Sequence, residues 1–192
     1  MMKIYLDFDE TITNSIGAVL SVLNPKYNTT YSPEEVKLWD FGDVFPNVKP
    51  DELASCFESD IFWRNLTFKE NAQEVIEKLL NRNYEITIVT KGTFNNLIKK
   101  VCWINKYFDN RINIVTLKPN ESKGNIDMSD GILIDDNQFY LKESNAKYKI
   151  LFENYKNCEW NNAWDSYIVH NWLEVAAAIE VLNEWEGRKW MM

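Results

Sequence analysis

The chain has 192 residues, of which 45% are apolar and 14% aromatic, so it can bury a substantial core and is not a disordered or fibrous protein. Its 29 acidic residues outnumber 21 lysines and arginines, and the net charge of −8 argues against a broad basic face for nucleic acid polymers or anionic membranes. The three cysteines form no closely spaced pair and His170 is the single histidine, so catalysis would depend on carboxylates, lysines and hydroxyls. Asp7 follows only three apolar residues, so we expect no signal peptide, no membrane span and a cytoplasmic protein.

Apolar patterns predict strands that alternate with helices along the chain. The first strand is expected over Lys3 to Phe8. The stretch from Thr11 to about Leu66 then differs in composition, with four of the five prolines and helix starts at Ser32 and Pro50. The later elements are a helix over 68–80, a strand over 84–89, a helix over 94–108, strands over 112–117, 131–134 and 148–152, and a helix over 172–185.

This order predicts an α/β fold with a Rossmann-like, mostly parallel sheet flanked by helices. Residues 1–13 and 67–192 would form the core, and residues 14–66 a small helical cap inserted after the first strand. Ligands of such sheets bind beyond the carboxyl ends of the strands, so the residues at those ends are the candidate site.

Acids, a hydroxyl and a cation stand where the predicted strands end. These residues are Asp7, Asp9, Thr90, Lys91, Asp135 and Asp136, and the loop before the last pair adds Lys118 and Lys123. Carboxylates of this kind bind Mg²⁺, which would draw in a phosphate whose charge a lysine helps to offset. One aspartate could then attack phosphorus, and a second could protonate the leaving oxygen and later activate water.

Four motifs in this order resemble the haloacid dehalogenase-like phosphatases: DFDET (Asp7 to Thr11), IVT (Ile88 to Thr90), a lysine, and LIDD (Leu133 to Asp136). The resemblance implies that Asp7 is the nucleophile and Asp9 the general acid and base. It also implies that Thr90 binds phosphate, that Asp136 binds Mg²⁺ beside Asp7 and the Asp9 carbonyl, and that Asp135 supports the metal site.

The middle and the tail of the chain are similar to the 5'(3')-deoxyribonucleotidases, the cytosolic type C 5'-nucleotidase family. Phe62 and Trp63 look like the end of that family's cap, and Glu159–Asn161 and Val169–Trp172 look like its tryptophan-containing tail segments. This likeness implies a Mg²⁺-dependent phosphatase that hydrolyses nucleoside monophosphates, with a preference for deoxyribonucleotides, through an aspartyl-phosphate. Phe62 and Trp63 would then contact the substrate.

The sequence departs from this family at three positions. The family's lysine precedes the acidic pair by ten residues, whereas Lys123 precedes Asp135 by twelve and Lys118 by seventeen; we favour Lys123. Lys91 stands where the family often has a small hydroxyl residue, and its ammonium could add attraction for phosphate. Ser15 replaces an aromatic residue that packs on the base. Besides Phe62 and Trp63, the stacking candidates are then Trp39 and Phe45.

The sequence leaves two other hypotheses about function open. The same motifs occur in phosphatases that act on phosphoserine in protein tails or on other small phosphomonoesters, although the predicted cap would cover the crevice that a protein tail needs. A binding module that has kept the site without catalysis is the second alternative. The chain is compatible with a homodimer, and we expect no nucleic acid polymer or membrane as partner.

Overall fold

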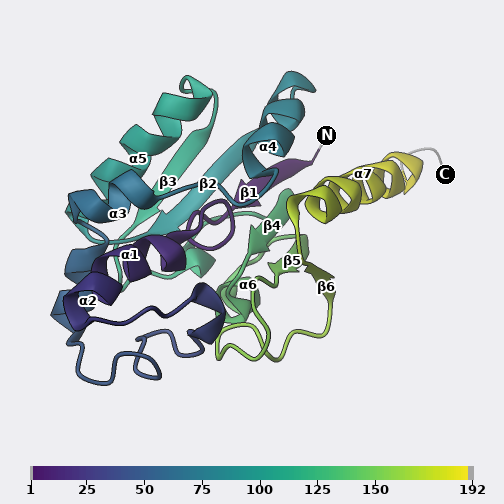
Figure 1. Ribbon diagram of the computed structural model, residues 1–192. Helices are drawn as coiled ribbons and strands as arrows, with labels where there is room; N and C mark the ends of the chain where they lie inside the picture. Colours follow the sequence, from purple (N-terminus) through teal and green to yellow (C-terminus); the bar gives the residue numbers. More distant parts are fainter. Residues whose placement is uncertain (1, 190–192) are drawn as a thin grey trace.

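A computed structural model describes residues 2–189 (Figure 1). These residues form a six-stranded sheet in the order β3-β2-β1-β4-β5-β6, in which every neighbouring pair is parallel. The strands are β1 (Lys3–Leu6), β2 (Ile86–Lys91), β3 (Asn113–Leu117), β4 (Gly131–Asp135), β5 (Tyr148–Phe152) and β6 (Tyr167–Val169). The predicted Rossmann-like sheet is therefore confirmed.

Strand β1 lies at the centre of the sheet, where Ile4 pairs with Ile86 of β2 on one side and with Ile132 of β4 on the other. All three side chains are almost fully buried, as expected for a strand that is covered on both faces. Parallel pairing places the ends of β1, β2 and β4 at the same edge of the sheet. The polar residues that follow these strands therefore lie next to one another.

Helices cover both faces of the sheet. The larger core cluster joins side chains such as Ile4 and Leu6 to three helices, α4 (Ala72–Asn81), α5 (Phe94–Phe108) and α7 (Trp172–Lys189). The smaller cluster lies on the opposite face, where Tyr5 and Leu133 share a core with Leu141 of α6 (Gln138–Glu143). Alternate residues of one strand thus enter two separate cores.

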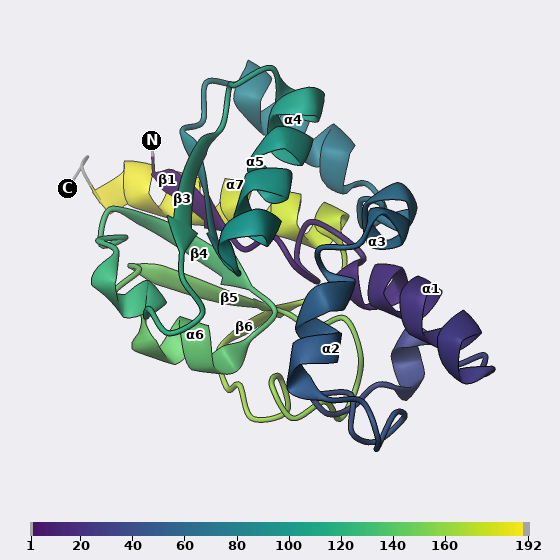
Figure 2. The same cartoon turned by 90° about the vertical axis from the view of Figure 1, so that its left-hand side faces the viewer.

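Four short elements between β1 and α4 form a helical layer beyond the ends of the strands (Figure 2). They are α1 (Ser15–Tyr27), η1 (Pro33–Glu35), α2 (Pro50–Cys56) and α3 (Asp60–Asn65). The chain segments that enter and leave this layer run side by side: Asn14 donates to the Thr67 carbonyl at 2.9 Å, and Lys69 donates to the Ile12 carbonyl at 2.9 Å. This pairing supports the division into a core and a cap at residues 13/14 and 66/67, which we propose.

The expected helix at Ser32 is only a single 3₁₀ turn. Ser32 and Glu35 form a capping box, but Val36 is extended at ψ 113° and ends the turn. The acids that favour a helix start are present, but the Lys37 and Leu38 amides that would continue the helix donate to the Asp43 carboxylate instead. Within residues 2–189, the structure has no helix that is both long enough and apolar enough to span a membrane.

Candidate active site

Three buried carboxylates gather where β1 and β4 end. Asp7, Asp135 and Asp136 each offer an oxygen within 4.8 Å of the others, and Oδ2 of Asp136 has no hydrogen-bond partner among the described residues. Burial raises the pKa of Asp136 well above its ordinary value, and the charges of Asp135 and Asp7 raise it further. Burial also raises the pKa of Asp7 to about 7, against the opposing effect of Lys123. An orphaned oxygen within a cluster of mutually repelling acids fits the oxygen-ligand chemistry of Mg²⁺.

Lys123 provides a buried positive charge for this acidic cluster. Its Nζ lies 2.5 Å from Oδ1 of Asp7 and 2.6 Å from Oδ2 of Asp135, and the side chain is fully buried. Burial alone would lower the pKa of Lys123, but the two carboxylates raise it, so the lysine stays charged. The η2 turn (Lys123–Asn125) fixes this position, and its Lys123 amide donates to Glu143 at 2.9 Å. Lys118, the alternative from the sequence, is exposed.

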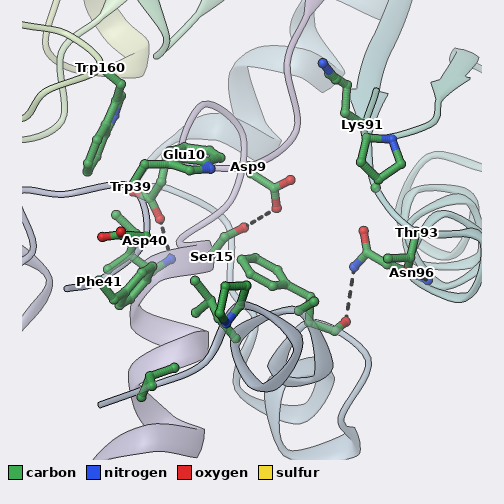
Figure 3. A pocket seen from close by; sticks show the side chains of 18 of the residues that line it. Asp9, Glu10, Ser15, Trp39, Asp40, Phe41, Lys91, Thr93, Asn96 and Trp160 are labelled. Carbon is green, nitrogen blue, oxygen red and sulfur yellow. Dashed lines mark hydrogen bonds between the residues drawn. The ribbon is translucent and has the colours of Figure 1, made fainter. Parts of the chain in front are cut away.

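The Asp9 side chain is not part of the acidic cluster and lines the neighbouring cavity. Ser15 donates a hydrogen bond to Oδ1 of Asp9 at 2.6 Å (Figure 3), and Lys100 forms a short ion pair with Oδ2. Ser15 is the first residue of cap helix α1, so the cap contributes directly to the orientation of this carboxylate. The sequence analysis noted Ser15 only because it replaces an aromatic residue of the family, and it did not predict this hydrogen bond.

Glu10 holds the loop that carries Asp9. Its φ of 55° lies in the left-handed region, which costs free energy for a residue other than glycine. Its carboxylate offsets that cost by accepting from the Ile16 amide at 2.6 Å and from Lys69 at 2.5 Å. Because Ile16 belongs to α1 and Lys69 follows the cap, Glu10 joins both connections between cap and core.

Lys100 is a site residue that sequence reasoning missed. It is 1% exposed, and its Nζ contacts Asp9, Thr90 Oγ1 at 2.8 Å and the Lys91 carbonyl at 2.9 Å. Helical periodicity treats a lysine as solvent-facing, so Lys100 within the predicted helix over 94–108 was not considered as a site residue. The available signal is spacing: Lys100 falls between Asn96 and Trp103 on the face that is actually buried.

Thr90 and Lys91 form the end of β2. Thr90 is fully buried beside Lys100, whereas Lys91 is partly buried and lines the cavity. Gly92 follows, and a Cβ at this position would meet Oδ1 of Asn96 at 2.3 Å. Asn96 in turn donates to the Phe57 carbonyl of the cap at 3.1 Å (Figure 3). The glycine therefore allows a contact that holds the cap over the strand ends.

A cavity of about 540 Å³ separates the cap from the strand ends. Asp9, Lys91 and Lys100 are its charged residues on the core side, together with Glu10. The cap side is mainly apolar, with Trp39, Phe41, Phe45, Val48, Leu53 and Phe57 among its lining residues. A cavity that is charged on the core side and mainly apolar on the cap side suits a ligand that has an anionic end and an apolar or aromatic body.

Phe62 and Trp63 do not line this cavity. Phe62 is fully buried and packs against Phe57, with ring centroids 5.3 Å apart, and Trp63 donates to the Phe57 carbonyl at 2.9 Å. Both residues therefore stand behind Phe57, which does face the cavity. Of the other predicted aromatic candidates, Trp39 and Phe45 are among the lining residues.

The parallel sheet with acids, threonine and lysine at its strand ends defines the haloacid dehalogenase-like fold. Among the solved structures that share it are a haloacid dehalogenase family hydrolase from Deinococcus radiodurans R1, with bound phosphate and sodium, and a haloacid dehalogenase-like family hydrolase from Xanthomonas campestris. The first gives a TM-score of 0.60 at 12% identity over 93% of this chain and 95% of its own. The second gives 0.53 at 13% identity over 98% of both chains.

Within that class, residues 1–184 match the sequence model of the 5' nucleotidase, deoxy (pyrimidine), cytosolic type C proteins (NT5C), and the chain belongs to this family. A relative from Staphylococcus epidermidis, named as a candidate 5'(3')-deoxyribonucleotidase, is 28% identical over 111 residues. That match spans 55% of this chain and 59% of the relative, so less than two thirds of the curated protein is covered.

Proposed function

We propose that this protein is a Mg²⁺-dependent phosphomonoesterase of the 5'-nucleotidase type, which hydrolyses nucleoside monophosphates and prefers deoxyribonucleotides. The observation that carries the proposal is the contact of Lys123 with both Asp7 and Asp135 beside a cavity with an apolar cap wall. The family and the name of the Staphylococcus epidermidis relative support the same activity, in a cytosolic setting.

Asp7, Asp136 and the carbonyl of Asp9 would hold the metal, with Asp135 in support. A bound Mg²⁺ would neutralise these acids and polarise a phosphate oxygen. The buried, unpartnered Oδ2 of Asp136 supports this assignment, because a buried carboxylate oxygen without any partner is otherwise costly.

The chain's own residues supply the rest of the chemistry. Asp7 attacks phosphorus and forms an aspartyl-phosphate, while Asp9 gives its proton to the leaving oxygen of the nucleoside. Asp9 then takes a proton from water, which attacks the phosphorus and releases phosphate and the free Asp7. Thr90, Lys91 and Lys123 hold the phosphate oxygens, and most of the acceleration comes from this positioning and charge neutralisation.

The apolar cap wall would contact the base and the sugar. Trp39 and Phe41 offer rings directly to the cavity, and Phe62 and Trp63 would act on the base through Phe57, which they support. A wall of this kind favours a deoxyribose, because it would bury a ribose 2'-hydroxyl with few partners. A cavity of about 540 Å³ is within the usual range for small-molecule sites.

A phosphatase for protein tails is a weaker alternative. The cap lies over the strand ends and is tied to α5, since Glu58 accepts hydrogen bonds from Thr93 and Asn95. An extended phosphopeptide would need an open crevice. Another small phosphomonoester remains the chemical alternative, because it needs only the core side of the site.

Phosphate release from a panel of substrates tests the proposal. The panel contains deoxy- and ribonucleoside 5'- and 3'-monophosphates, a phosphoserine peptide and an aryl phosphate, each with and without Mg²⁺. We expect selective Mg²⁺-dependent turnover of deoxynucleotides and none by Asp7→Asn. Turnover of the aryl phosphate alone would overturn the substrate assignment, and unchanged turnover by Asp7→Asn would overturn the nucleophile.

A further inference from the structure

Tyr140 of α6 is in contact with two lysines of the site and belongs to none of the motifs. The centroid of its ring lies 4.9 Å from Nζ of Lys91 and 4.8 Å from Nζ of Lys123. The ring lines the main cavity and also a neighbouring cavity of about 330 Å³. Tyr140 therefore contacts both lysines and also lines both cavities.

The three lysines of the site differ in their charge partners. Lys123 is paired with Asp7 and Asp135, and Lys100 is paired with Asp9. Lys91, in contrast, has no carboxylate within ion-pair distance among residues 2–189. A partly buried ammonium that no carboxylate neutralises is available to an incoming anion, but it is repelled by the other two lysines.

The face of an aromatic ring offers a partial negative charge that attracts an ammonium without neutralising it. The Tyr140 ring thus suits a cation that must be held in place and still remain free for a phosphate. The hydroxyl of Tyr140 forms no hydrogen bond with the described residues, so the ring face is its observed contact. Burial raises the pKa of Tyr140 to about 12, which keeps the side chain uncharged beside the acids.

We propose that Tyr140 is a positioning residue for the substrate phosphate, because its ring holds the unpaired Lys91 ammonium next to Lys123. The inference rests on the proposed function in one respect, namely that the anion bound there is the phosphate of the substrate. It concerns the phosphate end alone and does not depend on the identity of the leaving alcohol.

Inorganic phosphate and an aryl phosphate test this inference without a nucleotide. Tyr140→Leu removes the ring face, Tyr140→Met does so with a more flexible side chain in case the leucine variant folds poorly, and Tyr140→Phe restores the ring without the hydroxyl. Phe139→Leu is the matched control, since Phe139 is the preceding residue of α6, is 56% exposed and lines only the smaller cavity. Thermal unfolding checks that each variant is folded.

We expect Tyr140→Leu and Tyr140→Met to raise both the inhibition constant of inorganic phosphate and the KM about tenfold, with kcat changed less than about threefold. Tyr140→Phe should recover most of the phosphate affinity. An unchanged inhibition constant in folded Tyr140→Leu and Tyr140→Met would overturn the inference, and so would a loss in Tyr140→Phe as large as that in Tyr140→Leu.

A double-mutant cycle with Lys91→Met separates this role from general packing. If the ring acts through Lys91, Tyr140→Leu should have little further effect on phosphate inhibition once Lys91 is replaced. A full additional loss in the double variant would show that the ring acts elsewhere and would overturn the inference. Failure to turn over nucleotides, with the phosphate effects as expected, would instead refute only the substrate assigned to the protein.

Discussion

Nζ of Lys123 lies 2.5 Å from Oδ1 of Asp7, so a lysine from the loop before β4 contacts the first residue after β1. Asp135, at the end of β4, completes this link at 2.6 Å. Lys123 makes both contacts although it precedes Asp135 by twelve residues, and it does so as the first residue of the η2 turn. Lys123 thereby holds the Asp7 carboxylate against the end of β4.

Replacement of Lys123 by methionine is predicted to lower kcat/KM about 100- to 1,000-fold, because a charge that stabilises the transition state is lost from a buried site. The buried acids lose their cation as well, so the melting temperature should fall. Lys118→Met is the control, since Lys118 is exposed and its side chain has no contact with the site. Equal losses in the two variants, measured by steady-state kinetics, would contradict the assignment.

Lys100→Met is predicted to lower kcat about 10- to 100-fold, since Asp9 would lose one of the two contacts that orient it for proton transfer. Lys106→Met, an exposed lysine on the same helix, provides the control. The loss should be much smaller in an Asp9→Asn background, because the lysine acts through that carboxylate. Kinetics of the four variants test this, and a full additional loss in the double variant would speak against the role.

The fold could be predicted where apolar patterns were long and uniform. The helix over 94–108 and the strand over 148–152 have the predicted bounds. The helix α6 and the strand β6 were not predicted, because six and three residues are too few for a period to stand out. The aspartate and threonine motifs were accessible because each stands at the end of a strand, and parallel strands bring their ends together whatever the intervening chain does.

The remainder of the site depends on packing that sequence patterns do not report. Lys100 was missed because α5 buries a lysine on its core-facing side, where Asp9, Thr90 and the Lys91 carbonyl offset the cost of burying its charge. The orientation of the Phe62 side chain could not be predicted from the sequence either. In a helix of six residues, periodicity cannot tell whether an aromatic side chain faces a cavity or a neighbouring ring.

Asp136→Asn tests the metal site through stability. Burial raises the folded-state pKa of Asp136 and of Asp7 above the unfolded value of about 3.9, so their contribution to stability is present at low pH and is lost as the pH rises through the folded-state pKa. Without metal, Asp136→Asn should therefore melt higher than the wild type at pH 8, with a smaller difference at pH 5.

Added Mg²⁺ should make the wild type melt higher than Asp136→Asn at pH 8. The ion stabilises the folded wild type by binding to it, whereas the Asp136→Asn variant lacks one of the proposed metal ligands. Asp165→Asn, an exposed acid, should respond to Mg²⁺ as the wild type does. Thermal unfolding at both pH values, with EDTA or with Mg²⁺, measures the effect. An equal Mg²⁺-induced shift in the wild type and in Asp136→Asn would contradict the proposed ligand.

Trp39→Leu tests which aromatic residues contact the base. Trp39 is 50% exposed, lines the cavity and packs edge-on against Trp160 with ring centroids 5.7 Å apart, so its replacement should leave the fold intact. Loss of a stacked ring should raise KM for deoxynucleotides about tenfold or more. KM for glycerol phosphate, which has no ring, should stay unchanged.

Trp63→Leu should behave differently, because Trp63 supports Phe57 from behind and does not touch the cavity. We expect a lower melting temperature and a smaller rise in KM. Trp185→Leu, on α7 and 49% exposed, controls for the loss of a surface tryptophan. If Trp63→Leu raised KM for deoxynucleotides more than Trp39→Leu did, at equal stability, the base would have to reach the site behind Phe57, and the wall assigned to Trp39 and Phe41 would be wrong.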